Sequence, residues 1–417
     1  MPSNRLIMKK RSKKMSEIKV DKLTKIFGRP QKTAVRLLEE GKTKDEILAE
    51  TGMTVAVNQA SFEVQQGEVF VIMGLSGSGK STLVRMLNRL FEPSSGDIWL
   101  NDKNVAKMNK EELRNLRRKE MSMVFQNFAL LPHKTILQNG AYGLEIQGYS
   151  KEERETKAKE SLELVGLGGY LDKYPTELSG GMQQRVGLAR ALANDPNILL
   201  MDEAFSALDP LIRKDMQDEL MDLQQSVHKT IIFITHDLDE ALRIGDRIAL
   251  MKDGAIVQVG TAEEILMQPA DDYVERFVED VDLSKVLTAA HIMKRAESIT
   301  VDRGPRTALE LMRNEGISTI FVTDKSRKLL GYITADQAQK AVDEGLEVKE
   351  VLTPDIPTTA PDILLNDLFD KLAESWAPLS VVDDQGRLEG IIVRGSVIGA
   401  LSGSDEIINE NGSGVTS

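Results

Sequence analysis

A glycine-rich loop at Gly74–Thr82 constrains the fold of this 417-residue chain more than any other segment. The loop matches the phosphate-binding pattern G-x-x-x-x-G-K-[ST], and it lies between a strand-like run, Glu68–Met73, and a helical run, Leu83–Leu90. The glycines let backbone N–H groups turn inward around phosphates, and the helix N-terminus adds partial positive charge. An accidental Gly/Ser turn would not need this strand–loop–helix context. The loop therefore predicts a nucleotide-binding α/β domain.

Within the loop, Lys80 is expected to reach the β- and γ-phosphates of a nucleotide, and the Ser81 hydroxyl to coordinate Mg²⁺. The remaining loop residues are expected to line the phosphate site: Gly74, Leu75, Ser76, Gly77, Ser78, Gly79 and Thr82.

A second apolar strand-like run, Asn197–Glu203, ends in two acidic residues. A strand that delivers Asp202 beside a phosphate-binding loop predicts a contact to Mg²⁺. Glu203 is then placed to polarise the water that attacks the γ-phosphate. An apolar strand followed by Asp-Glu is often only structural, but its pairing with the loop favours the catalytic interpretation.

Another glycine pair indicates that the site needs two chains. Ser179, Gly180 and Gly181 precede a helical run, Gln184–Ala193, and predict a second helix N-terminus able to hold phosphate. One ATP cannot use two distant helix ends of the same chain. Two chains arranged head to tail, however, can each lend one.

Two polar residues follow further strand-like runs. Gln126 comes after Met121–Phe125, and His236 comes after Ile231–Thr235. A lone histidine at a strand end is usually structural, yet His236 falls where a contact to the γ-phosphate is needed. Periodic helix and strand segments alternate to about Val281, which favours a parallel or mixed sheet.

In this order the motifs resemble the ATP-binding cassette (ABC) ATPase family, over residues 18–281. The resemblance implies a P-loop NTPase with a RecA-like core, a helical subdomain, and a nucleotide-sandwich homodimer that binds ATP and Mg²⁺. It implies Glu203 as general base and His236 as γ-phosphate contact. It also implies Gln126 as a link to Mg²⁺ and to a membrane partner, with residues 126–148 passing the motion on.

The resemblance assigns two further residues. Asp209 closes the family's D-loop motif, Ser206–Asp209, and Phe27 matches the aromatic platform for adenine at the end of the first strand. Phe27 could alternatively be a plain core residue, because a charged, helix-like insertion at 28–53 follows it directly and departs from the family pattern.

Past Ser284 the chain contains a tandem repeat. Residues 299–341 resemble residues 357–400 at a shift of 59 positions, mostly in apolar and turn residues, as a duplicated α/β unit requires. The repeat resembles a tandem CBS pair, expected over 284–342 and 343–402. The ribose-binding Asp that usually follows Gly-x-x-Thr by three positions is absent, because Asp336 comes one residue early. A regulatory ligand role and a purely dimerising role both remain open.

The insertion and the CBS pair together resemble the ATPase subunits of importers for glycine betaine and proline betaine. That resemblance implies transmembrane permease subunits, a substrate-binding protein or domain, and control by ionic strength or cyclic di-AMP. Salt would weaken the interaction of clustered positive charges with acidic surfaces. One such cluster consists of Lys294, Arg295, Arg303, Arg306 and Arg313, although a run of this kind is usually only a solvated surface. The alternatives are an importer ATPase for choline, carnitine or another solute, a soluble ABC ATPase, and a non-catalytic sensor.

Composition sets the remaining limits. Lys plus Arg total 53 and Asp plus Glu total 65, so the formal charge is −12, which argues against a nucleic-acid partner. The absence of cysteine excludes disulfides, thiolate catalysis and Cys-ligated metals. We expect a peripheral protein on the cytoplasmic face of the membrane, with a disordered basic arm at 1–17 that could touch anionic lipid and a flexible tail at 403–417.

Overall fold

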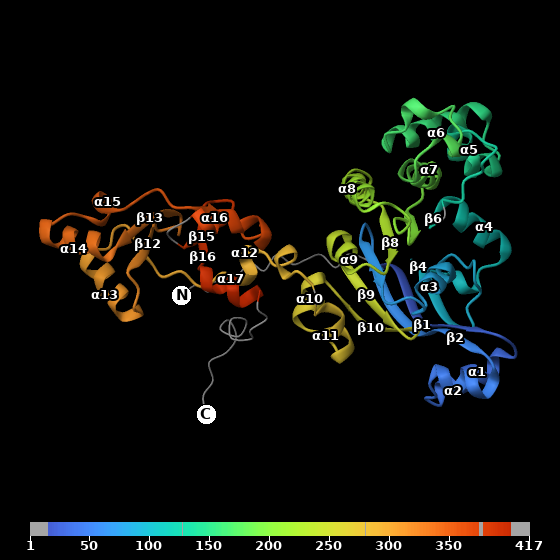
Figure 1. The fold of residues 1–417 in the computed structure, drawn as a ribbon, viewed down its shortest axis with the longest axis horizontal. Helices are drawn as coiled ribbons and strands as arrows, with labels where there is room; N and C mark the ends of the chain where they lie inside the picture. Colours follow the sequence, from blue (N-terminus) through green and yellow to red (C-terminus); the bar gives the residue numbers. More distant parts are fainter. Residues whose placement is uncertain (1–15, 127, 280, 375–377, 402–417) are drawn as a thin grey trace. The chain divides into compact units, whose positions relative to one another are not determined.

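The protein forms two compact units that divide between Asp280 and Val281. Figure 1 shows the chain as a computed structural model, which describes residues 16–126, 128–279, 281–374 and 378–401. The predicted tail, and all but the last two residues of the predicted arm, lie outside the described residues. The expectations about their structure and about lipid binding therefore stay predictions.

The N-terminal unit is built on a six-stranded sheet in the order β10-β9-β3-β8-β7-β6. Neighbouring strands are parallel except β9 and β10, which form an antiparallel pair. Strands β3, β7 and β8 are buried along their whole length, which explains their continuous apolar sequences. The strands are β3 (Val69–Met73), β6 (Met121–Phe125), β7 (Ile198–Asp202), β8 (Thr230–Thr235), β9 (Arg247–Lys252) and β10 (Ala255–Gly260).

A four-stranded antiparallel sheet in the order β2-β1-β4-β5 completes the strand framework of this unit. Its inward side chains share one apolar core with the six-stranded sheet and with helix α3 (Lys80–Leu87). The phosphate-binding loop therefore runs between a buried strand and a buried helix. The strands are β1 (Ser16–Phe27), β2 (Thr54–Gln65), β4 (Ser95–Leu100) and β5 (Lys103–Asn104).

The insertion at 28–53, predicted as one helix-like stretch, forms two helices, α1 (Gln31–Glu39) and α2 (Lys44–Thr51). The second helix begins where the Thr43 side chain and Glu46 form a reciprocal capping box, and it ends at Gly52 in the left-handed conformation. The two helices enclose a small apolar cluster of their own: Ile26, Ala34, Leu37, Leu38, Ile47, Met53 and Val55.

Helices α5, α6 and α7 pack on one another and form the predicted helical subdomain, at the top of the N-terminal unit in Figure 1. The other helices of this unit follow the strands of the core. Their bounds are α4 (Lys110–Lys119), α5 (Ile136–Gln147), α6 (Lys151–Leu164), α7 (Gly180–Leu192), α8 (Pro210–Val227), α9 (Leu238–Ile244), α10 (Ala262–Met267), α11 (Asp272–Val278), and the 3₁₀ turns η1 (Val105–Lys107), η2 (Gly168–Tyr170) and η3 (Pro175–Glu177).

The C-terminal unit repeats one small sheet twice, in the orders β11-β12-β13 and β14-β15-β16. In each sheet the first two strands are parallel and the last two are antiparallel. The two halves therefore share one topology, as expected for a duplicated unit. The elements are η4 (Leu283–Lys285), α12 (Ala289–Ile292), β11 (Ser298–Thr300), α13 (Pro305–Glu315), β12 (Thr319–Thr323), β13 (Leu329–Thr334), α14 (Ala335–Glu344), α15 (Val348–Val351), β14 (Thr358–Thr359), η5 (Leu365–Leu368), α16 (Phe369–Glu374), β15 (Leu379–Val382), β16 (Leu388–Ile392) and α17 (Arg394–Leu401).

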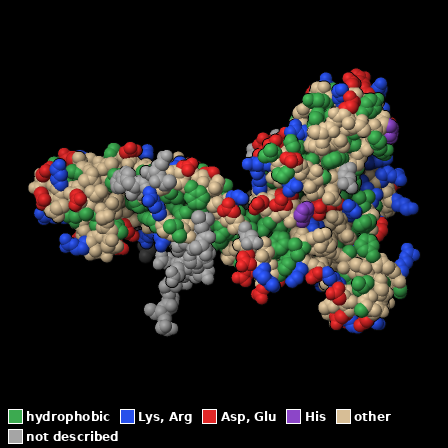
Figure 2. All heavy atoms as spheres, in the orientation of Figure 1, with side chains coloured by type: hydrophobic (Ala, Val, Ile, Leu, Met, Phe, Trp, Pro, Cys, Tyr) green, Lys and Arg blue, Asp and Glu red, His purple; other side chains and the backbone are tan. Residues whose placement is uncertain are grey.

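The surface of both units is charged. Figure 2 shows acidic and basic side chains interspersed on the visible face, as the sequence composition leads one to expect. Across the part of the chain that the structure describes, no helix combines the length and the apolar character needed to span a bilayer.

Candidate nucleotide-binding site

The phosphate-binding loop follows β3 and depends on glycine at two positions. Gly74 and Gly79 have φ angles of 146° and 99°, which side chains rarely adopt. A Cβ at Gly74 would lie 2.2 Å from the Met251 carbonyl oxygen, and one at Gly79 would lie 2.2 Å from the Ala56 carbonyl oxygen. The loop backbone can therefore pack against the backbone of residues 251 and 56 only because these two positions are glycine.

Lys80 begins helix α3 and is buried. Its ammonium group donates hydrogen bonds to the carbonyl oxygens of Gly74, at 2.8 Å, and Leu75, at 3.0 Å. Burial lowers the pKa of Lys80, while the nearby Glu203 and Asp202 carboxylates act in the opposite direction. The cation is thus held inside the loop, where incoming phosphates would replace its carbonyl partners.

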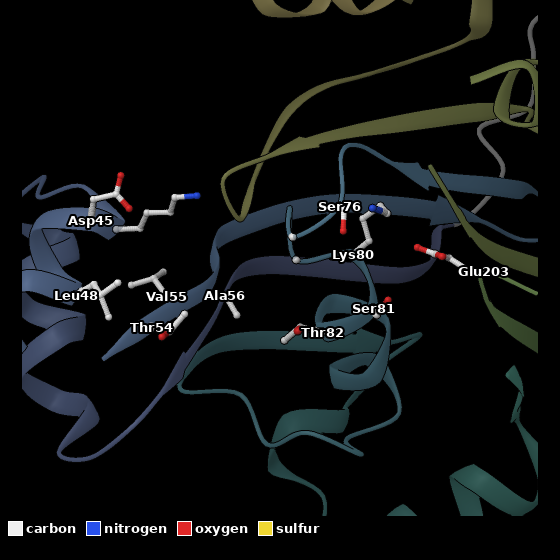
Figure 3. Close-up of a pocket in the computed structure, with 13 residues that line it drawn as sticks. Asp45, Leu48, Thr54, Val55, Ala56, Ser76, Lys80, Ser81, Thr82 and Glu203 are labelled. Atoms are coloured by element: carbon white, nitrogen blue, oxygen red, sulfur yellow. The ribbon is translucent and has the colours of Figure 1, made fainter. Parts of the chain in front are cut away.

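A cavity of about 440 Å³ opens over the loop, within the size range of small-molecule sites. The insertion and the start of β2 form its other wall, which the motifs did not predict. Figure 3 shows Asp45 and Leu48 on one side and Lys80 and Glu203 on the other. The lining residues are Lys44, Asp45, Leu48, Thr54, Val55, Ala56, Ser76, Gly77, Gly79, Lys80, Ser81, Thr82 and Glu203.

Three adjacent parallel strands, β6, β7 and β8, deliver the remaining polar groups, because their carboxyl ends meet at one edge of the sheet. The Glu203 carboxylate lies 3.5 Å from Nδ1 of His236. The Gln126 amide nitrogen donates to Glu203 at 3.4 Å and to the Ser206 hydroxyl at 3.1 Å. The structure thus brings together the three residues that the sequence predicted from separate motifs.

Glu203 adopts the left-handed backbone conformation, with a φ of 47°. Its N–H donates to the Ile234 carbonyl oxygen of β8 at 3.2 Å, which ties the residue to the neighbouring strand. A non-glycine residue in this region is uncommon and is often found at functional sites. The conformation turns Glu203 out of the buried strand and into the cavity.

Asp202, at the buried end of β7, has a partner that the sequence analysis missed. The Arg85 guanidinium donates twice to one carboxylate oxygen, from Nη2 at 2.9 Å and from Nε at 3.1 Å. A buried carboxylate needs such compensation, and Arg85 lies on α3 one turn after Ser81. No sequence motif pairs these two residues, because their contact depends on how α3 packs beside β7.

The predicted metal ligands are Ser81, Gln126 and Asp202. Together they offer hydroxyl, amide and carboxylate oxygens, the donor types that Mg²⁺ prefers. Of the three, Ser81 lines the cavity and Gln126 and Asp202 do not, while the Gln126 amide nitrogen donates to Glu203 and Ser206. The donor set therefore fits Mg²⁺, which would share Asp202 with Arg85.

The second helix end that the sequence predicts to hold phosphate, at Ser179–Gly181, does not line the cavity of its own chain. Helix α7 begins at Gly180, one turn earlier than predicted, and the Ser179 hydroxyl caps it by accepting from the Met182 N–H at 3.3 Å. A Cβ at Gly181 would lie 2.5 Å from Cγ2 of Ile212, so α7 approaches α8 closely there. Asp209 caps α8 and is also absent from the lining.

Helix α7 is tied to the segment that follows Gln126. Arg190 donates to the carbonyl oxygens of Ala129, at 2.6 Å, and Phe128, at 2.9 Å. Both acceptor residues have positive φ angles. This connection joins the helical subdomain to the strand end that carries Gln126, and sequence reasoning had not found it.

Phe27 is 40% exposed, which argues against the plain core interpretation. Its ring instead packs edge-on against Phe91, with centroids 5.7 Å apart, and it does not line the cavity. Its strand partner Thr54 does line the cavity. The predicted stacking of adenine on Phe27 therefore stays a prediction.

In the C-terminal unit the position of the usual ribose-binding Asp is held by Gln337, which has structural partners. Thr334 and Gln337 form a capping box at the start of α14, and the Gln337 amide donates to the Thr353 hydroxyl at 2.9 Å. Asp336 points to solvent. The side chain at this position of the first repeat is therefore held by helix capping and by Thr353, and it is not the usual carboxylate.

A P-loop lysine, a strand-end glutamate beside a histidine, and a helical subdomain with its own capped glycine pair define an ABC-type ATPase. The family model described as ABC transporter matches residues 57–206, and the CBS domain model matches residues 286–344 and 348–403. These findings confirm the predicted fold class.

Curated relatives match nearly the whole chain. The glycine betaine transport ATP-binding protein OpuAA of Bacillus subtilis is 63% identical over 396 residues, which covers 95% of each chain. The glycine betaine/carnitine transport ATP-binding protein GbuA of Listeria monocytogenes is 59% identical, over 95% of this chain and all of the relative. ProV of Escherichia coli, a glycine betaine/proline betaine transport system ATP-binding protein, is 47% identical over 92% of this chain and 97% of its own.

Among solved structures, a dimeric post-hydrolysis state of the ATP-binding cassette MJ0796, bound to ADP and Pi, is 31% identical with a TM-score of 0.50. The match covers 58% of this chain and 98% of that one. The chain belongs to the ABC transporter ATP-binding proteins, in the family of the betaine-transport ATPases with C-terminal CBS domains. It is therefore an ATP-binding, ATP-hydrolysing subunit of a membrane transport system, as the sequence predicted.

Proposed function

We propose that this chain hydrolyses ATP to power import of glycine betaine or a closely related quaternary amine osmoprotectant. The contact of Glu203 with His236 beside the buried Lys80 supports the ATPase mechanism. The names of relatives at 63%, 59% and 47% identity support the solute class. Carnitine is the second candidate solute, because the name of the relative at 59% identity includes it.

The chemistry is assigned to the residues at the strand ends. Lys80 neutralises the β- and γ-phosphates, and Glu203 takes the proton from the attacking water. His236 contacts the γ-phosphate and orients Glu203. Mg²⁺, held by Ser81, Gln126 and Asp202, would neutralise charge on the phosphate oxygens.

The complete site is proposed to need two chains. Ser179 and Gly181 of one chain would face the phosphate-binding loop of the other, because neither lines the cavity of its own chain. The position of α7 relative to the phosphate-binding loop of the other chain would then depend on whether a nucleotide is bound. Arg190 links α7 to residues 128–129, so the movement of α7 when the dimer closes would be passed to residues 126–148. These residues would pass the movement to the transmembrane permease subunits. The permease subunits would work with a substrate-binding protein or domain. This arrangement puts the chain on the cytoplasmic face of the membrane.

The C-terminal unit is proposed to regulate the ATPase. Ionic strength is the first candidate signal, because Lys294, Arg295, Arg303, Arg306 and Arg313 are all exposed and would interact less with acidic surfaces as salt rises. Cyclic di-AMP is the second candidate, and it would have to bind without the usual ribose-binding Asp. Contact of the N-terminal basic arm with anionic lipid would add to the salt dependence.

Uptake measurements test the solute. The chain, assembled with its membrane partners in vesicles, should accumulate radiolabelled glycine betaine when ATP is inside the compartment that holds the ATPase. Unlabelled carnitine and choline serve as competitors. Uptake of choline or carnitine that exceeds uptake of glycine betaine would replace the proposed solute and leave the ATPase assignment in place.

A further inference from the structure

The end of the nucleotide cavity opposite the catalytic residues is formed by the insertion, for which no role has yet been assigned. Lys44, Asp45 and Leu48 of α2 line it together with Thr54, Val55 and Ala56 of β2. Figure 3 shows Leu48, Val55 and Ala56 on this side, away from Lys80 and Glu203. The wall combines apolar side chains with one cation and one carboxylate, whereas the loop side is mainly backbone and hydroxyl groups.

The position of the phosphates determines what this wall can bind. In the proposed function the triphosphate lies on the loop at Lys80, with its γ-phosphate towards Glu203. A nucleotide extends from its phosphates through the ribose to the base, so its base must lie away from Glu203. Leu48 is 46% exposed in the chain, which leaves apolar surface for a planar ring to cover.

We propose that helix α2 is a nucleobase-binding wall in which Leu48 packs on the base of the bound nucleotide. The inference rests on the proposed nucleotide function and adds a binding residue to it. Phe27 is not among the residues that line this wall, and its ring packs edge-on against Phe91. The insertion therefore has a direct role in nucleotide affinity.

The wall is connected to the phosphate-binding loop. Lys44 forms an ion pair with Asp253, in the turn between β9 and β10. The next residue of that turn, Gly254, donates to the Ser78 carbonyl oxygen at 3.1 Å and accepts from the Asn58 N–H at 2.8 Å. One turn thus contacts the insertion, the loop and β2, and it sets the distance between the base wall and the phosphate site.

Calorimetric titration of the full chain separates the base contact from the phosphate contact. The probes are ADP, which is not hydrolysed, and inorganic pyrophosphate, which has no base. Leu48→Gln should weaken ADP binding about fivefold to tenfold and leave pyrophosphate binding unchanged, because only the base covers Leu48. Leu164→Gln is the matched control, since Leu164 is an exposed leucine on α6 outside the cavity, and it should change neither affinity.

The other outcomes are distinct. Lys80→Ala should weaken both probes, and an unchanged affinity of this variant for both would overturn the proposed nucleotide site itself. A second outcome is that Lys80→Ala weakens the binding of both probes while Leu48→Gln binds ADP normally. That result would overturn the base wall and leave the nucleotide site in place. An equal loss of ADP and pyrophosphate affinity in Leu48→Gln would also overturn it, because the change would then act through the loop.

Discussion

The two units of this protein place the polar side chains proposed to be functional in different surroundings. In the N-terminal unit the polar groups stand at the ends of buried parallel strands of five or six residues, β3, β7 and β8. In the C-terminal unit the strands that begin each repeat, β11 and β14, have three and two residues, and the basic residues of interest are exposed. Buried strands fix the distances between catalytic groups, whereas exposed charge responds to the ions in the solvent.

This difference explains why short motifs identify the N-terminal unit, whereas the C-terminal unit is identified mainly by its repeated apolar pattern. In the proposed mechanism Lys80, Asp202 and Glu203 occupy fixed positions around phosphate, so only certain residue types can serve there. In the C-terminal unit, by contrast, Gln337 caps a helix at the position where a ribose-binding Asp would be expected. We therefore propose that the first unit carries out catalysis and the second responds to the solution conditions.

The largest effect is expected from Glu203→Gln, which removes the proposed base and keeps the shape of the side chain. Turnover should fall by about 10²–10⁴-fold, while ATP-bound dimer accumulates because hydrolysis no longer separates the chains. Phosphate release and size-exclusion chromatography measure the two consequences. Glu160→Gln, an exposed glutamate on α6, is the control. Normal hydrolysis in Glu203→Gln would show that another group takes the proton.

Lys80→Ala should lower ATP affinity by roughly 10- to 100-fold, because a charge-assisted contact to two phosphates is lost. Equilibrium binding checks this, with Lys110→Ala on the exposed side of α4 as control. The thermal midpoint of both variants should be recorded, since Lys80 also binds the loop carbonyls. An ATP affinity equal to that of the unchanged chain would contradict the assignment of the loop.

Arg85→Ala leaves the Asp202 carboxylate buried without its double hydrogen bond. The free energy of unfolding should fall by about 1–2 kcal/mol, less than for a fully buried pair, because the Arg85 side chain is 40% exposed. Urea denaturation measures the loss. Arg85→Lys should lose less because it keeps the charge, and Arg114→Ala, on an exposed position of α4, should lose almost nothing. Equal stability of all three variants would remove Arg85 as the partner that stabilises Asp202.

Removal of residues 284–417 should have the smallest effect on basal ATP hydrolysis, within about twofold, because the cavity lies wholly in the N-terminal unit. The salt response of the assembled transporter should change instead. Neutralising Arg303, Arg306 and Arg313 in the full chain tests whether their charge carries that response. A truncated chain with the same salt profile as the full chain would leave the CBS pair without the proposed regulatory role.

Sequence motifs predicted the phosphate end of the site, because each functional residue there follows a buried apolar strand and the strand ends converge. They could not predict the opposite wall, since Leu48 and Asp45 belong to an insertion whose packing depends on a separate small core around Ile47. Arg85 was missed for a related reason: its role appears only when α3 and β7 are placed side by side. The start of α7 was placed late because Gly180 and Gly181 disfavour helix in isolation, and the Ser179 cap outweighs that preference.

The most direct test of the account is ATP hydrolysis by this chain, assembled with its membrane partners in vesicles of anionic lipid. Hydrolysis is measured with and without glycine betaine, at low and at high ionic strength. Glycine betaine is expected to stimulate hydrolysis at high ionic strength and to have little effect at low ionic strength. Hydrolysis that ignores glycine betaine at both ionic strengths would contradict the proposed coupling of this ATPase to betaine import.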